Sequence, residues 1–256
     1  PMAAAVVAME VVSVGVMYYA ALLPCVIASI IAAEFATGVG LNPETFPVAR
    51  IPQLSVESGL KMAVIAAGCG LLSILFCVAL KAVSGIYGKY LKNPYLRVCV
   101  AGCLVIGITM LLGTGDYMGA GNELIARAVE QGKARPLDFL WKMILTAITM
   151  RAGYRGGEIV PAFSVGATFG CVAGGLLGFS PEVAAAASMV ALFCGVTNCP
   201  IASMLISFEL FGFSGAAYYL IAISISYALS GYYSLYKDQT IVYSKYKARY
   251  INKKTH

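Results

Sequence analysis

The sequence predicts an all-α, polytopic membrane protein built from tilted and broken helices. Of its 256 residues, 60% are hydrophobic and only 12% are charged, which is about half the charged fraction of a soluble domain, roughly 25%. Six runs near the length of a membrane crossing, about 20 residues, contain no Asp, Glu, Lys or Arg. They are residues 11–33, 62–80, 98–115, 159–181, 183–208 and 210–236. Glycine and proline interrupt several of these runs, which is typical of transporters, because backbone groups freed inside a membrane must be buried in protein or line a cavity.

The chain is expected to form its elements in a simple order. A short helix over 1–12 and a long one over 14–37 precede a proline-rich loop at 41–58. Next come a long, tilted helix over 59–91, a helix over 96–113, a glycine-rich and then amphipathic segment over 113–136 and a short span over 137–150. The remaining helices are expected at 156–178, 183–196, 201–211 and 216–236, followed by a last segment at 239–251.

The basic residues predict an orientation. Lys81, Lys89, Lys92 and Arg97 lie between two spans with no acidic residue among them, and six more basic residues follow residue 236. Short segments rich in Lys and Arg stay on the cytoplasmic side. We therefore expect a multi-pass protein of the cell membrane with a cytoplasmic C-terminus. A basic tail beside a span is far more often a membrane-flanking segment than a nucleic-acid patch, so no nucleic-acid partner is expected.

Cysteine usage gives no sign of a metal centre. All eight cysteines lie within the uncharged runs. Cys99 and Cys103 have the i, i+4 spacing of a helical metal site, but no histidine or carboxylate accompanies them. We read them as small packing residues and expect neither a metal nor a cofactor.

Two segments follow the same residue pattern, which indicates an internal repeat. Residues 1–10 (PMAAAVVAME) and 200–209 (PIASMLISFE) both begin with proline and end with glutamate nine residues later. A carboxylate facing lipid costs a few kcal/mol, so its recurrence at one offset favours a repeat over two unrelated helices. Repeats in transporters place the substrate site between the two halves.

The stretch 155–170 (RGGEIVPAFSVGATFG) has the features of an anion-binding helix start. Two glycines precede the expected helix, and Pro161 falls in its first turn. The exposed N–H groups and the positive dipole end of such a start bind an anion without any cationic side chain. Glycines at 166, 170 and 174 leave one helical face without side chains, which predicts close packing against a neighbouring helix.

These features resemble the CLC family of chloride channels and anion/proton antiporters. The stretch 155–170 matches the family's G-G-x-x-x-P pattern and its G-x-x-x-G continuation, and 113–125 resembles the glycine-rich segment upstream. Residues 198–209 look like the family's Ala-Pro-(apolar)-Glu helix, residues 1–10 look like its first-half counterpart, and 241–245 (IVYSK) resembles the start of its last helix. The resemblance implies a CLC-type inverted-repeat fold, present as a fragment. Residues 1–37 would end the first repeat, 59–251 would form the second, and 252–256 would be a cytoplasmic tail.

The resemblance also implies a function and a site. A protein of this kind transports a small inorganic anion, chloride or fluoride, across the lipid bilayer as a channel or anion/proton antiporter, and it forms a homodimer through helices around 1–37 and 200–236. The anion would contact the backbone of Gly157, Glu158, Ile159 and Val160 and the hydroxyl of Tyr243. By its sequence surroundings alone, Tyr243 is one of a belt of interfacial tyrosines. Val11 stands where proton-exchanging members often place a relay glutamate, which resembles channel-type members.

Glu158 departs from the chloride-conducting pattern. Most chloride members have an apolar residue at this position, and a glutamate resembles the fluoride-exporting branch. The side chain has three readings, namely a helix cap, a proton carrier and a selectivity element. At the positive end of a helix dipole its pKa is expected to fall below the ordinary value. A fixed charge there favours a strongly hydrogen-bonding anion, so fluoride is expected to move at least as well as chloride.

The alternative function is an integral membrane enzyme acting on a lipid or a prenyl phosphate. Such enzymes need Asp-rich, His or Ser/His/Asp constellations at the membrane face. The sequence has one histidine, His256, and three aspartates, Asp116, Asp138 and Asp238. The composition therefore favours a transporter without enzymatic activity, and broken helices with anion-facing ends also disfavour a purely structural membrane partner.

Overall fold

The computed structural model describes residues 1–41, 43–48 and 50–255. Asn42 and Ala49 of the expected 41–58 loop, and His256 of the expected tail, lie outside the described residues. The described part contains ten α-helices, a short 3-10 turn and a small sheet. The helices are α1 (Met2–Glu10), α2 (Leu22–Gly38), α3 (Val56–Tyr90), α4 (Pro94–Leu112), α5 (Asn122–Glu130), α6 (Asp138–Ala152), α7 (Ile159–Leu176), α8 (Pro181–Thr197), α9 (Pro200–Phe211) and α10 (Ala216–Leu229).

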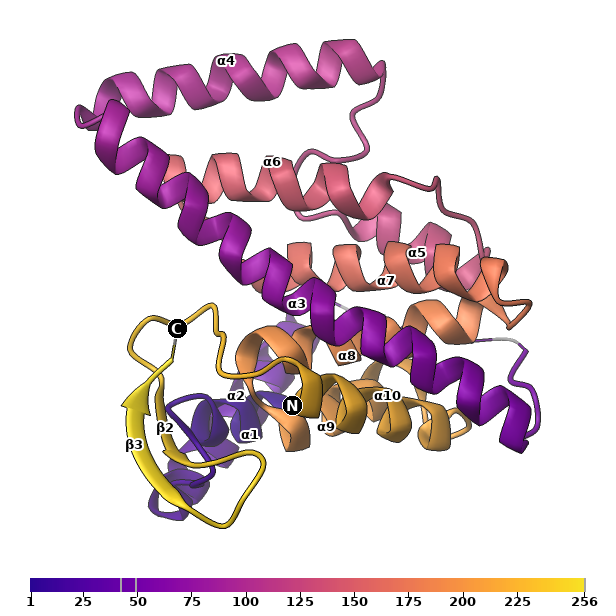
Figure 1. Cartoon of the computed structure of the whole chain (residues 1–256). Coiled ribbons are helices and arrows are strands. Elements are labelled where there is room, and N and C mark those ends of the chain that lie inside the picture. Colours follow the sequence, from indigo (N-terminus) through magenta and orange to yellow (C-terminus); the bar gives the residue numbers. More distant parts are fainter. Residues whose placement is uncertain (42, 49, 256) are drawn as a thin grey trace.

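Helix α8 forms the centre of the fold. Every residue from Val183 to Thr197 is buried, as expected for a helical stretch without charge on any face. It packs against α3, α7, α9 and α10. In Figure 1, α3 runs diagonally across the molecule and α4 stands apart from the other helices.

Small residues allow α7 and α8 to approach closely. A methyl group on Gly170 would lie 2.3 Å from the carbonyl oxygen of Ala184, and one on Gly166 would lie 2.6 Å from that of Ser188. These separations are shorter than any normal contact of a side chain. The glycine-lined face therefore has the packing role expected from its spacing.

Fewer helices are long enough to cross a membrane than the six uncharged runs suggest. Within the described residues, four helical stretches are long and apolar enough to cross a membrane, and three shorter apolar helices accompany them. The four are Tyr19–Gly38, Val56–Tyr90, Pro94–Leu112 and Ile159–Leu176. Proline at position 200 begins a new helix, and Gly212 and Gly215 separate α9 from α10. These breaks divide the last two uncharged runs into short helices.

The helix expected over 14–37 begins later than expected. Ser13–Val14 form strand β1, and Tyr19–Ala21 form the 3-10 turn η1 before α2. Helix α10 ends at Leu229 and not at residue 236. Gly231 follows with a φ of 61°, a left-handed conformation that glycine adopts at helix ends without a steric penalty.

The expectation of a helix beginning at residues 241–245 is wrong. Thr240–Tyr243 form β2, which pairs in parallel with β1 and antiparallel with β3, Tyr250–Lys254. The run Thr-Ile-Val-Tyr is β-branched and aromatic, so it favours a strand once a partner is present, and β1 supplies that partner. The expected domain boundary between 251 and 252 falls inside β3, and Figure 1 shows the sheet at the edge of the molecule.

Helices α1 and α9, the two repeat-like segments, cap each other. The Glu10 carboxylate accepts hydrogen bonds from the N–H groups of Ile201 (3.1 Å) and Ala202 (2.8 Å), at the start of α9. The Glu209 carboxylate accepts them from Met2 (2.8 Å) and Ala3 (3.3 Å), at the start of α1. The two helices therefore lie antiparallel, and each carboxylate satisfies N–H groups that a helix start leaves without partners.

Candidate anion-binding site

The first turn of α7 has the donors that an anion needs. Glu158 is the N-terminal flanking residue of this helix and Ile159 is its first residue. N–H groups in a first helical turn have no partner within the helix, and Pro161 has no N–H group at all. The backbone N–H groups of Ile159 and Val160 are therefore the donors that the positive helix end presents.

A cavity of about 460 Å³ lies beside this turn. Gly156, Gly157, Val160 and Pro161 line one part of it, and the loop Tyr117–Ala120, helix α6, Val105 of α4 and the residues Tyr154 and Arg155 line the rest. A methyl group on Gly157 would have no atom within 4 Å. The backbone at Gly157 is therefore open to a small ligand.

A buried lysine also lines this cavity. Lys142, on α6, is 1% exposed, and its ammonium group donates to the carbonyl oxygens of Tyr117 (3.1 Å) and Gly119 (2.8 Å). Lys142 lies within the short span expected over residues 137–150, and sequence reasoning assigned it no role in the site. A single lysine within an apolar helix was the available signal, because such a residue inside a membrane protein usually faces a polar interior.

Glu158 lies in an ion pair at the same helix start. Its Oε1 atom is 2.9 Å from an Nη atom of Arg151, and both side chains are about one-fifth exposed. Burial raises the pKa of the Glu158 carboxyl group, while Arg151 and Lys237 act in the opposite direction. The expectation of a lowered pKa is wrong, because the cost of removing the charge from water exceeds the stabilisation by nearby positive charge.

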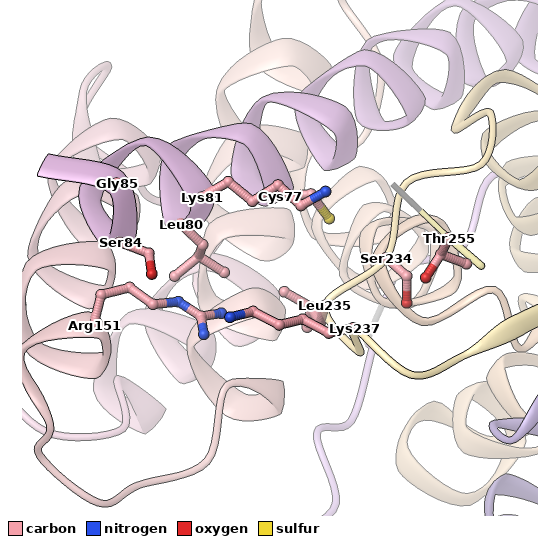
Figure 2. Close-up of a pocket in the computed structure, with 10 residues that line it drawn as sticks. All are labelled: Cys77, Leu80, Lys81, Ser84, Gly85, Arg151, Ser234, Leu235, Lys237 and Thr255. Carbon is pink, nitrogen blue, oxygen red and sulfur yellow. The ribbon is translucent and has the colours of Figure 1, made fainter. Parts of the chain in front are cut away.

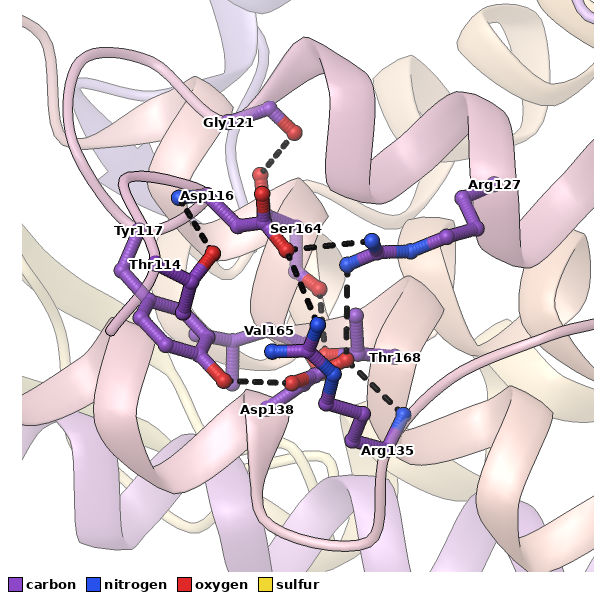
Figure 3. A network of polar contacts seen from close by, with 10 residues as sticks. All are labelled: Thr114, Asp116, Tyr117, Gly121, Arg127, Arg135, Asp138, Ser164, Val165 and Thr168. Atoms are coloured by element: carbon purple, nitrogen blue, oxygen red, sulfur yellow. Dashed lines mark hydrogen bonds and ion pairs between the residues drawn. The ribbon is translucent and has the colours of Figure 1, made fainter. Parts of the chain in front are cut away.

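A polar network holds the glycine-rich loop against α6 and α7 (Figure 3). The hydroxyl of Tyr117 donates to Asp138 Oδ1 over 2.6 Å, and Arg127 pairs with Asp116 over 3.0 Å. The hydroxyl of Ser164, on α7, donates to the carbonyl oxygen of Gly121 over 3.1 Å. These contacts fix the loop that forms one wall of the cavity.

Tyr243 is placed on the sheet. It lies in β2, its side chain is 47% exposed, and its ring makes an edge-to-face contact with Tyr250 at 5.9 Å between centroids. The structure thus joins Gly157, Val160 and Glu158 at one helix start and locates Tyr243 on a different element. Sequence reasoning did not identify Arg151 as the partner of Glu158, since nothing in the spacing of the two residues indicates an ion pair.

Comparison with known proteins agrees with this architecture. The sequence model described as "voltage gated chloride channel" matches residues 1–231. A "chloride/fluoride channel protein" of Pseudomonas syringae pv. tomato is 32% identical to this chain, with 96% of the chain and 56% of that protein covered. The crystal structure of a CLC-type fluoride/proton antiporter superposes with a TM-score of 0.89 at 30% identity, covering 93% of this chain and 60% of that one.

A more distant structure shares the fold. A eukaryotic CLC transporter superposes with a TM-score of 0.60 at 20% identity, covering 84% of this chain and 38% of that one. The chain thus spans a little over half the length of the curated relative. Since the family model matches residues 1–231, and a CLC-type antiporter superposes over 93% of the chain, the chain belongs to the voltage-gated chloride channel, or CLC, family.

Proposed function

We propose that the full-length protein transports a small inorganic anion across a membrane and that fluoride is among its substrates. The observation that carries the proposal is Glu158, a half-buried carboxyl group of raised pKa at the donor-rich start of α7. Two relatives at about 30% identity are described as a chloride/fluoride channel and a fluoride/proton antiporter. Both descriptions support an anion as the transported species.

In this proposal, the start of α7 accepts an anion and a proton together. The N–H groups of Ile159 and Val160 offer hydrogen bonds to an anion at the positive end of α7. A charged Glu158 carboxylate at the same end repels that anion, whereas the protonated form removes the repulsion and can itself donate a hydrogen bond. Because burial raises the pKa of Glu158, the protonated form is reached at a higher pH than for an exposed glutamate. Fluoride accepts hydrogen bonds more strongly than chloride and gains most from this donor.

Anion efflux from liposomes containing the full-length protein tests the role of Glu158. In the wild type we expect fluoride flux at least equal to chloride flux and rising as pH falls, since protonation of Glu158 permits anion entry. Glu158→Gln stays uncharged at every pH, so its flux should lose most of that pH dependence, and Glu158→Ala should reduce the preference for fluoride. Glu57→Ala, at the exposed start of α3, is the control. Chloride flux far above fluoride flux in the wild type would contradict the proposal.

The role of Tyr243 rests on the family resemblance of residues 241–245. We propose that its hydroxyl donates to the bound anion in the full-length protein. Tyr243→Phe should then weaken equilibrium anion binding by about 0.5–1.5 kcal/mol, the value of one neutral hydrogen bond. Tyr250→Phe, at its ring partner, is the matched control. Equal affinities for the wild type and Tyr243→Phe by calorimetry would remove Tyr243 from the site.

The homodimer through helices around 1–37 and 200–236 is also a proposal. Helix α2 has no buried residue, and Leu23, Ile31 and Phe35 are 70%, 63% and 74% exposed. An apolar helix with this exposure needs lipid or another subunit beside it. Cysteine pairs introduced on α2 should cross-link two full-length subunits in lipid. Monomeric behaviour in both detergent and lipid would contradict the dimer.

Orientation and domain limits complete the proposal. The basic residues after residue 236 support a cytoplasmic C-terminus. The reciprocal capping of α1 and α9 supports a division in which residues 1–37 end one repeat and 59–251 belong to the next. A cysteine introduced at position 253 should react with an impermeant thiol reagent in inside-out vesicles and stay unreacted in right-side-out vesicles.

A further inference from the structure

Three cationic side chains line a second cavity, of about 380 Å³, which we call the basic pocket (Figure 2). Lys81 comes from α3, Arg151 from α6 and Lys237 from the segment after α10. In Figure 2 the guanidinium group of Arg151 and the ammonium group of Lys237 point toward each other. Among the described residues, those that line the basic pocket are distinct from those that line the cavity beside α7.

Positive charge exceeds negative charge in the basic pocket. Glu158 is the carboxylate that pairs with Arg151, at 2.9 Å. Asp238 adjoins Lys237 in sequence, but its carboxylate pairs with Lys254 at 3.0 Å and is 93% exposed. Lys81 and Lys237 are exposed and Arg151 is half-buried, so water screens part of the repulsion among the three cations. One carboxylate for three cations leaves a site that an added anion would stabilise.

Not every hydrogen-bond donor in the basic pocket has an acceptor. The Nε atom of Arg151 is buried and has no hydrogen-bond partner among the described residues. A buried donor without a partner is uncommon in folded proteins. Ser84 and Ser234 also line the basic pocket, so two hydroxyl groups accompany the cations, whereas the hydroxyl of Thr255 already donates to the carbonyl oxygen of Tyr236 at 3.0 Å. A ligand with several acceptor atoms would satisfy these donors together.

We propose that the basic pocket binds a phosphate-class oxyanion, supplied either as free phosphate or as the phosphate of a lipid headgroup. The planar guanidinium of arginine pairs with two oxygens of such an anion, and lysines supply point charges. A tetrahedral oxyanion presents oxygens toward several sides, whereas a halide offers a single centre. Arg151 links this site to Glu158, because an oxyanion on the guanidinium competes with the carboxylate for the same donors.

Titration calorimetry with inorganic phosphate tests the proposal on the full-length protein. The protein is held in detergent and in a buffer free of halide, so the measurement does not depend on transport. Lys81→Gln and Lys237→Gln should each weaken phosphate binding about 10-fold, the effect of losing one charge-assisted contact. Glu158→Gln should strengthen binding several-fold, because it removes the competing carboxylate. Lys92→Gln, in the loop between α3 and α4 and outside the basic pocket, should leave binding unchanged.

A second titration distinguishes the two sources of phosphate. Short-chain phosphatidic acid replaces inorganic phosphate, with short-chain phosphatidylcholine as the lipid control. Binding of phosphatidic acid alone, weakened by Lys237→Gln, supports a lipid headgroup, and binding of inorganic phosphate with the same sensitivity supports a free oxyanion. The proposal is overturned if folded protein, judged by its elution from a sizing column, binds neither probe. It is also overturned if Lys81→Gln and Lys237→Gln both bind phosphate as the wild type does.

Discussion

The reciprocal caps of α1 and α9 allow a local stability prediction. Glu10 is 7% exposed, and its carboxylate accepts the N–H groups of Ile201 and Ala202 at 3.1 and 2.8 Å. Substitution by glutamine keeps the shape but removes the charge. One carboxylate oxygen becomes an NH₂ group, which faces an N–H donor and cannot accept from it. We therefore expect Glu10→Gln to loosen the start of α9.

The free-energy cost of Glu10→Gln follows from the two hydrogen bonds that the carboxylate accepts. Hydrogen bonds to charged groups contribute about 1.5–3 kcal/mol, and a charge at a helix end adds about 0.3–1 kcal/mol. Losing one such bond and the charge predicts about 2 kcal/mol for opening the start of α9, or roughly 30-fold in the opening equilibrium. Glu209→Gln is the matched comparison, because Glu209 accepts both N–H groups at the start of α1 with one oxygen, Oε1, whose place the amide oxygen of glutamine can take. Glu209 is 26% exposed, so water replaces part of the lost interaction, and the cost should be below about 1 kcal/mol.

Cys199 reports this opening directly. It is fully buried at the residue preceding α9, and it becomes reactive only when that segment opens. The rate of maleimide labelling at Cys199, mapped by mass spectrometry, should rise roughly 30-fold in Glu10→Gln and much less in Glu209→Gln. Cys69, buried on α3, is the internal reference. Unchanged labelling at Cys199 would refute the capping argument, and an equal rise at Cys69 would show that the loss is global.

Further substitutions test the packing and the polar contacts described above. Gly170→Ala places a methyl group 2.3 Å from the carbonyl oxygen of Ala184, so it should lower the thermal unfolding temperature, at a cost of about 1–3 kcal/mol. Gly175→Ala, where the added methyl group meets open space, should leave that temperature unchanged. Equal unfolding temperatures for the two variants would contradict the close α7–α8 contact. Tyr117→Phe removes the 2.6 Å hydrogen bond to buried Asp138 and should cost about 1–3 kcal/mol in the same assay, with exposed Tyr95→Phe as its control. Lys245→Met removes contacts to Ser230 Oγ at 3.0 Å and to the Tyr227 ring at 4.3 Å, so limited proteolysis should cut the segment after α10 faster, and an unchanged cleavage rate would show that Lys245 does not anchor it.

Local composition was sufficient for most of the helices and for their membrane character. Long uncharged runs predict helices in a membrane because only an intrasegment hydrogen-bonding pattern satisfies the backbone there. The spacing of Gly166 and Gly170 predicts a close helix contact, and the matching ends of residues 1–10 and 200–209 predict related helices. Each of these inferences depends on residues a few positions apart, which is the range over which sequence periodicity acts.

Pairings between distant segments were decided by the tertiary structure. Residues 240–243 form a strand because β1, more than 220 residues earlier, offers its edge, and no local pattern identifies that partner. Glu10 and Glu209 are recognisable as recurring carboxylates, but only the antiparallel packing of α1 and α9 makes each the cap of the other helix. Glu158 has a raised pKa and not a lowered one because burial is a property of the whole fold. The sequence by itself thus determined the helices, their membrane character and the donor-rich start of α7. Only the folded chain decides which charged groups pair, which side chains are buried, and that one cavity is lined by Lys81, Arg151 and Lys237. Each of these depends on segments that the sequence keeps far apart.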